Sequence, residues 1–217
     1  MIPRRYERLK QVLSKRQADL TVITEDVHKP HNFSAIIRTC DAVGVFEVHA
    51  VNSNSEMPTY STVAKGSDKW VNLRTHDRLE NAIAQLHQKD IKIYAAHLSN
   101  KAVDYRSIDY TKPTAILMGA EKHGVSDLAA DLVDGHINIP MFGMVESLNV
   151  SVAAAVILFE AQRQRLAAGM YDRVSLDTET FERIIFEWGY PDIAAMYRRR
   201  GEPYPPLKED GSIAVRD

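Results

Sequence analysis

Arg38 stands among apolar residues in the stretch PHNFSAIIRTCDAVGV, which runs from Pro30 to Val45. The apolar residues recur at helical spacing and predict an amphipathic helix that a glycine would end: Phe33, Ile37, Cys40 and Gly44. An arginine keeps its charge, and burying it without a partner costs several kcal/mol. Arg38 is therefore expected either to pair with an internal acid, Asp41 or Glu47, or to bind an anion from outside.

A second stretch, LMGAEKHGVS, places Gly119 and Gly124 on either side of Glu121. The G-x-x-x-x-G spacing is that of a phosphate-binding P-loop, but the lysine that this loop requires after the second glycine is Val125 here, which excludes it. A glycine-rich turn between a strand and a helix is the structural alternative, and it needs no ligand.

The third stretch, IPMFGMVESLNVSVA, precedes a long apolar helix. Ser147 and Asn149 are expected at its start, where backbone N–H groups lack helical partners and form a site for an anion or another ligand. A serine at a helix start is common, so this stretch is a weak indicator by itself.

These stretches follow predicted strands, and strand-like and helix-like segments alternate from Leu20 onward. The expected strands cover residues 20–25, 46–51, 70–75, 91–98, 114–120 and 136–140. The expected helices cover residues 32–43, a segment from Asp77 with Glu80 in a capping box, 127–132 after Ser126, and 147–167; residues 52–61 are expected to form a loop. This alternation predicts an α/β fold with a mostly parallel sheet, whose carboxyl edge is where such folds bind ligands.

The two ends of the chain do not fit the alternation. Residues 1–19 are expected to form a basic helical extension, residues 20–168 the catalytic core, and residues 169–217 a helical extension with a mobile, proline-rich tail from Glu202. Both ends are rich in basic residues, which is typical either of a solvated helix face or of a surface that follows phosphates. The candidate phosphate contacts are Arg8, Arg16, Arg163, Arg165 and Arg173.

The composition is that of an ordinary globular protein: 217 residues, 45% hydrophobic, 26% charged, with a formal net charge of −2. The single Cys40 excludes an internal disulfide, and no histidine and cysteine spacing indicates a metal site. The first residues lack the apolar segment of a signal peptide, and the longest apolar run, 152–159, is too short to cross a membrane. A cytoplasmic protein without a membrane partner is expected.

Taken together and in this order, NFSAIIRT, LMGAEKHGVS and IPMFGMVESLNVSVA resemble the three signature motifs of the SPOUT RNA 2′-O-methyltransferases. The resemblance covers roughly residues 20–168. It implies an α/β fold whose C-terminal part forms a deep trefoil knot, a rare exception among protein folds. It also implies S-adenosyl-L-methionine as cofactor and a homodimer.

The resemblance assigns roles position by position. Arg38 is the catalytic residue at the ribose 2′-hydroxyl, either as the base or by stabilising the alkoxide and holding a phosphate. The other catalytic candidates are Asn32, Glu121, Ser147 and Asn149. The cofactor is expected to contact backbone around Leu117, Gly119, Ile139, Met141 and Leu148.

The short extensions resemble those of family members that methylate guanosine-18 in the D-loop of tRNA. Because the methyl acceptor is a 2′-hydroxyl, DNA is not an expected substrate. Another tRNA position or ribosomal RNA is the nearest alternative, and a non-catalytic RNA chaperone on the same fold is an alternative of another class. A Rossmann enzyme is excluded because no G-x-G-x-x-G turn follows the first strand.

Overall fold

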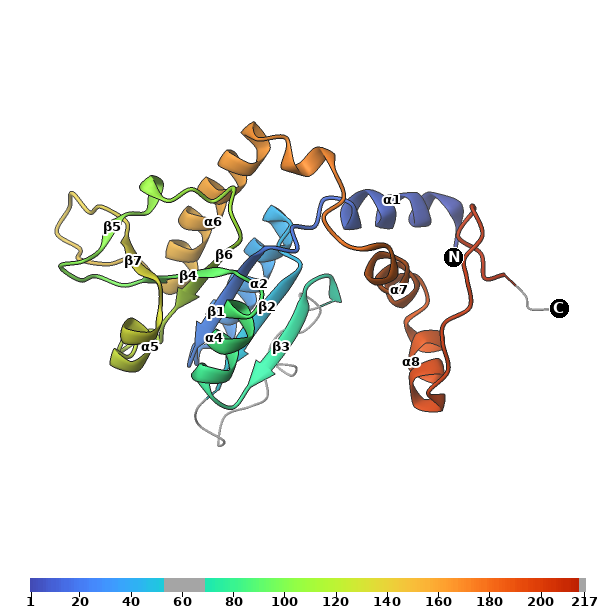
Figure 1. Cartoon of the computed structure of the whole chain (residues 1–217), viewed down its shortest axis with the longest axis horizontal. Helices are drawn as coiled ribbons and strands as arrows, with labels where there is room; N and C mark the ends of the chain where they lie inside the picture. The colour runs from blue at the N-terminus through green and yellow to red at the C-terminus, as the bar shows by residue number, and fades with distance from the viewer. Residues whose placement is uncertain (53–68, 215–217) are drawn as a thin grey trace. The chain divides into compact units, whose positions relative to one another are not determined.

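The computed structural model describes residues 1–52 and 69–214 (Figure 1). The loop expected over residues 52–61 lies outside the described residues apart from Asn52. The chain forms two compact units, one of Ala18–Met170 and one that combines Met1–Gln17 with Tyr171–Asp217.

Within the described part of the unit Ala18–Met170, seven strands form one sheet in the order β3-β2-β1-β6-β4-β7-β5. In chain order they are β1 (Leu20–Glu25), β2 (Glu47–Val51), β3 (Asn72–His76), β4 (Lys92–Ala96), β5 (Val103–Asp104), β6 (Thr114–Met118) and β7 (Gly135–Asn138). Every pairing among these strands is parallel, which confirms the α/β prediction. The two-residue strand β5 is too short to leave a period in the sequence, and it was not predicted.

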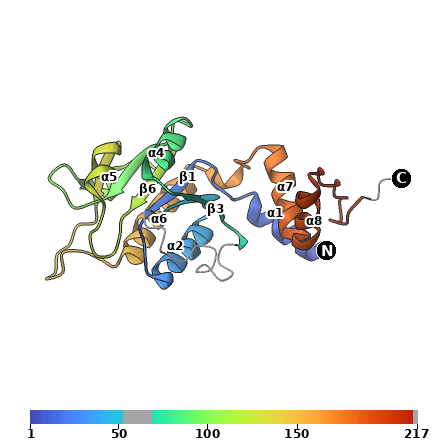
Figure 2. The same cartoon turned by 90° about the horizontal axis from the view of Figure 1, so that it is seen from below.

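Helices cover both faces of the sheet, so the central strands are apolar on both sides. Figure 2 shows α2 (Pro30–Val43) and α6 (Val150–Ala167) on one side, and α4 (Leu79–His87) and α5 (Asp127–Leu132) on the other. Phe33, Ile37 and Cys40 are buried against the sheet, as predicted, and so are Ile36 and Val43, while Gly44 ends the helix.

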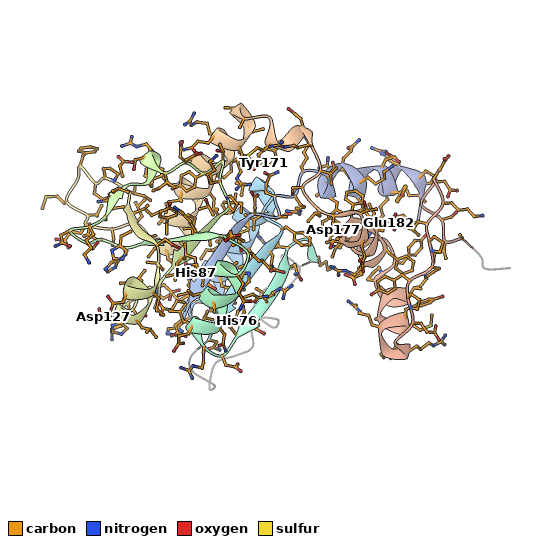
Figure 3. The ribbon with its side chains drawn as sticks, in the orientation of Figure 1. His76, His87, Asp127, Tyr171, Asp177 and Glu182 are labelled. Carbon is orange, nitrogen blue, oxygen red and sulfur yellow. The ribbon has the colours of Figure 1, made fainter. Side chains whose placement is uncertain are left out.

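The helix starts agree only in part with the predictions. Ser126 caps α5, whose first residue Asp127 is labelled in Figure 3, by accepting the backbone N–H of Ala129 at 3.1 Å. The prediction of a capping box at Asp77 is wrong, because α4 begins at Leu79 and no side chain caps it.

The long helix α6 begins at Val150, three residues later than predicted, with Asn149 as its N-cap. Ser147 therefore lies outside the helix. The deep knot that the family resemblance implies stays a prediction.

The unit of Met1–Gln17 and Tyr171–Asp217 is helical, as predicted for the extensions. Its helices are α1 (Pro3–Leu13), α7 (Thr178–Gly189) and α8 (Pro191–Arg200). Phe186 lies at the centre of a group of aromatic rings, and the ring of Tyr204 stacks on it with 4.7 Å between centroids. In the tail, Leu207 and Ile213 form an antiparallel bridge, and the structure describes the chain as far as Ala214. The mobility of the tail stays a prediction.

Arg165 ties the end of α6 to the sheet. Its side chain is fully buried, its Nε donates to the carbonyl oxygen of Tyr110 at 2.8 Å, and one Nη donates to that of Lys112 at 3.1 Å. The other Nη lies 2.5 Å from a carboxylate oxygen of Asp19. The planar guanidinium thus serves two carbonyls and an acid at once from three separate nitrogens, whereas a lysine carries its three donors on one nitrogen.

We predict that Arg165→Ala lowers the free energy of unfolding by about 3 kcal/mol, because it leaves buried carbonyls and an acid without their donor. Arg163→Ala is the matched control on the same helix. Its exposed side chain pairs with Glu160, and its loss should cost less than about 1 kcal/mol. Chemical denaturation of the two variants measures both values, and equal losses would contradict the anchoring role of Arg165.

Candidate functional site

A cavity of about 560 Å³ lies at the carboxyl ends of β4, β6 and β7. The last residue of each strand lines it: Ala96, Met118 and Asn138. Its volume is in the range of small-molecule sites, and its position is where parallel sheets bind ligands. The second and third sequence motifs form much of its wall, as their positions after strands predicted.

The cavity gathers most of the residues proposed for cofactor binding, namely Gly119, Ile139, Met141 and Leu148. Leu117 is not among the lining residues. Its side chain is fully buried in the core that β6 forms with α4 and α5. Of the catalytic candidates, Glu121, Ser147 and Asn149 line the cavity. Residues that the sequence did not indicate also line it, among them Lys29, His97, Leu98 and Asn138.

The wall formed by residues 119–125 is a tight turn that requires glycine. Ala120 and Gly124 exchange two backbone hydrogen bonds, of 2.9 and 2.8 Å. A Cβ on Gly119 would lie 2.2 Å from the carbonyl carbon and oxygen of Gly124, and Gly124 itself has a φ of +69°. The two glycines therefore serve the turn, as the structural alternative expected, and the turn also forms part of a cavity.

Glu121 projects from this turn to the start of α2. Its carboxylate accepts the backbone N–H groups of Lys29 at 3.0 Å and His28 at 3.2 Å, and the side-chain amide of Asn32 at 2.9 Å. These backbone donors precede Pro30 at the first turn of the helix, where no helical acceptor is available. Glu121 therefore acts as an anionic cap that comes from a distant part of the chain.

Burial raises the pKa of Glu121, but the hydrogen bonds from Asn32, Lys29 and His28 outweigh it and hold the pKa below its usual range. The carboxylate is thus charged near neutral pH and cannot serve as a proton donor there.

Asn149 extends this network to the third motif. Its Nδ2 donates to Oδ1 of Asn32 at 3.2 Å, while its own Oδ1 accepts the backbone N–H of Ser151 at 2.9 Å. Asn32 is almost completely buried and bonds to Glu121 on one side and Asn149 on the other. One chain of side-chain hydrogen bonds therefore joins the three stretches that the sequence singled out.

Arg38 lies on the exposed side of α2 and is not among the residues that line the cavity. Glu47, one of the two acids offered as a partner for Arg38, bonds to Nε of Arg74 at 2.5 Å and to Nδ2 of Asn72 at 2.6 Å. Burial raises the pKa of Glu47, but contacts with His49 and Arg74 lower it to about 2. The side chain of Arg38 is thus accessible from solvent.

The basic candidates separate into two groups. Arg8, Arg163 and Arg173 are exposed, although Arg163 also bonds to Glu160. Arg16 and Arg165 are 1% and 0% exposed, and the guanidinium of Arg16 lies over the ring of Trp188 at 5.6 Å. The prediction that these two arginines contact phosphates does not fit their burial, because their guanidinium groups lie inside the fold and not on its surface.

Some of the residues that the sequence analysis missed do have a local signal. Pro30 indicates a helix start two residues before the predicted Asn32, and hence unpaired N–H groups near Lys29. Glu25, an acid at the end of an otherwise uncharged strand, is buried and bonds to Ser126. Asn138 and Leu98 carry no such signal, because only the fold brings them to the cavity.

Comparison with known proteins agrees with this geometry. The SpoU rRNA Methylase family matches residues 19–159, and the family described as SpoU, rRNA methylase, C-terminal matches residues 163–215. The chain therefore belongs to the SpoU methylase family.

The chain is 54% identical over 215 residues to a protein of Escherichia coli K12 named tRNA (guanosine(18)-2′-O)-methyltransferase, with 98% of this chain and 94% of that protein covered. Its structure is similar to the crystal structure of the A. aeolicus TrmH/SpoU tRNA modifying enzyme, with a TM-score of 0.80, 43% identity, and coverage of 88% of this chain and 97% of the other. The SpoU methyltransferase AviRb from Streptomyces viridochromogenes, solved in complex with the cofactor AdoMet, gives a TM-score of 0.62 at 26% identity, covering 71% of this chain and 64% of that chain.

We predict that Gly119→Ala opens the turn of residues 119–125, because the added methyl group has no space. Amide hydrogen exchange at Ala120 and Gly124 should become faster by about 10-fold or more, as expected when a strained turn gives up its hydrogen bonds. Gly143→Ala is the matched control, because a Cβ there meets nothing within 4 Å. Unchanged exchange in Gly119→Ala would show that the turn tolerates a side chain.

Proposed function

We propose that this protein transfers a methyl group from S-adenosyl-L-methionine to the ribose 2′-hydroxyl of guanosine-18 in the D-loop of tRNA. The observation that carries the proposal is the hydrogen-bonded chain of Glu121, Asn32 and Asn149, which joins all three family motifs at one cavity. The name of the Escherichia coli relative supports the substrate.

The cavity fits this cofactor in size and in chemistry. Apolar side chains such as Leu98, Ile139 and Leu148 line it and suit a nucleoside base. The carboxylates of Glu121 and Glu146 also line it and suit a positively charged sulfur and amine. When bound, S-adenosylmethionine supplies a methyl group on a cationic sulfur, which makes that methyl group electrophilic.

Residues of the three sequence motifs divide the remaining work. Arg38 holds a phosphate of the tRNA and stabilises the negative charge that develops on the 2′-oxygen as its proton leaves. An arginine guanidinium stays protonated in water and is a poor base, which favours this role over proton abstraction. Asn32 is buried and bonded to Glu121 and Asn149, so it orients Arg38 through α2, while Asn149 positions the third motif. The exposed hydroxyl of Ser147 is available to a phosphate.

Glu121 positions these groups by fixing the start of α2 and the amide of Asn32. In this role its carboxylate stays charged, in agreement with its lowered pKa.

The tRNA contacts extend beyond the cavity in this proposal. We assign the catalytic domain to residues 20–168 and the RNA-binding extensions to residues 1–19 and 169–217. Arg8, Arg163 and Arg173 are the exposed cations that would contact phosphates, and each contact adds to the salt dependence of tRNA binding. Within the described residues no helix has the length and apolar character of a membrane span. A location in the cytoplasm, with its tRNA, is part of the proposal.

A homodimer is also part of the proposal. Val152, Phe159 and Leu166 are exposed on α6 at intervals of seven residues, so they share one face of the helix. In the loop before α6, Phe142 and Met144 are 97% and 99% exposed. Apolar side chains gathered in this way are typical of a protein interface, and a second copy of the chain is the partner that the family resemblance implies.

We predict that sedimentation of the wild-type protein gives the mass of a dimer and that Phe159→Asp shifts it to the monomer, because a carboxylate would be buried in the interface. Leu128→Asp is the control, since Leu128 is a similarly exposed apolar residue on α5. A monomeric wild-type protein would refute the dimer.

The substrate is tested with unmodified tRNA transcripts and methyl-labelled S-adenosylmethionine. We expect label on the transcript that carries guanosine-18 and none on a transcript in which this nucleotide is replaced. Label on both would move the target to another tRNA position. Label on neither, with cofactor still bound, would favour ribosomal RNA or a non-catalytic RNA chaperone.

The same assay measures the role of Arg38. Arg38→Ala should lower turnover by a factor of about 100 or more, the effect of removing a group that stabilises developing negative charge. Arg106→Ala, which removes an exposed arginine paired with Asp104, is expected to keep full activity.

A further inference from the structure

Glu25 is a buried acid next to the cavity wall that the proposed mechanism does not use. It is the last residue of β1 and is 6% exposed. Both of its carboxylate oxygens accept hydrogen bonds from Ser126: one from the backbone N–H at 3.0 Å and one from the hydroxyl, with 2.5 Å between the oxygens. The two residues are 101 positions apart in the chain.

Ser126 directly follows the turn of residues 119–125. Its hydroxyl oxygen also accepts the backbone N–H of Ala129, so the same side chain starts α5 and bonds to β1. The turn is therefore held at two places, by Glu121 against α2 and by Ser126 against the end of β1.

We propose that Glu25 is a positioning residue for cofactor binding, because it fixes the end of the cavity wall through Ser126. This inference rests on the proposed function, since it assumes that S-adenosylmethionine binds in this cavity. A carboxylate is costly to bury, and an apolar side chain would fill a strand position without that cost. The two hydrogen bonds to one residue offset the cost and place the backbone at Val125 and Gly124, which line the cavity.

Glu47 offers a matched comparison within the same sheet. It is a buried acid on the neighbouring strand β2, 8% exposed, and its carboxylate bonds to Asn72 and Arg74 on β3. It is not among the residues that line the cavity. Replacing Glu47 therefore removes a comparable buried network without touching the cavity wall.

The experiment compares Glu25→Ala, Glu25→Gln and Glu47→Ala by calorimetric titration with S-adenosylmethionine and by steady-state kinetics. Glu25→Ala should weaken cofactor binding and raise its KM by about 10-fold, the effect of losing two hydrogen bonds to a charged group, with kcat and the KM for tRNA nearly unchanged. Glu25→Gln should restore binding, because its amide oxygen can accept the backbone N–H while its NH₂ donates to the serine hydroxyl.

Glu47→Ala should lower the thermal stability and leave the KM for the cofactor unchanged. Ser126→Ala, which changes an exposed residue and keeps the backbone contact to Glu25, should raise the cofactor KM by about 3-fold even if Glu25→Ala does not fold.

The outcomes separate this inference from the proposed function. A wild-type protein that binds no S-adenosylmethionine would overturn both. Normal cofactor binding in the wild type together with an unchanged KM in Glu25→Ala, or in Ser126→Ala where the former is unfolded, would overturn the positioning role alone. Equal effects of Glu25→Ala and Glu47→Ala on the KM for the cofactor would overturn the positioning role, because they would show that Glu25 only contributes to the stability of the fold.

Discussion

The carboxylate of Glu121 is the contact on which the rest of the site depends. It receives three N–H groups, two of them from the backbone at the start of α2, where a helix leaves its donors unpaired. These hydrogen bonds outweigh the cost of burial and keep the group charged. The carboxylate reaches this position because two backbone hydrogen bonds between Ala120 and Gly124 close the turn that carries it. That closure requires the absence of a side chain at Gly119. A local steric requirement thus determines a contact between distant parts of the chain.

The sheet order explains why these parts meet. β1 and β6 are neighbours and parallel, so the segments that follow them leave the sheet at the same edge. Asn32 at the start of α2 and Glu121 in the turn are 89 residues apart in the chain, yet their side chains are joined by a hydrogen bond. The segment after β7 returns along the same edge, and Asn149 bonds there to Asn32.

Charged residues of the same type have different roles in this fold, and burial decides which. Arg163 and Arg165 are two positions apart on α6, so they point to opposite sides of the helix. The first is exposed and pairs with Glu160, whereas the second is enclosed by carbonyl groups and Asp19. Glu25 and Glu47 are both buried strand residues, and they differ instead in their partners: Glu25 bonds to Ser126 next to the cavity wall, whereas Glu47 bonds to Arg74 on β3.

The sequence by itself determined the α/β alternation, most strands, the apolar face of α2 and the three stretches that form the site. These follow from periodicity, glycine positions and capping residues, which act over a few neighbouring residues. Only the tertiary structure decided that Arg16 and Arg165 are internal, that Ser147 lies outside α6, and that Lys29, Leu98 and Asn138 line the cavity. Burial and long-range hydrogen bonds depend on which segments the sheet brings together, and no local pattern records that.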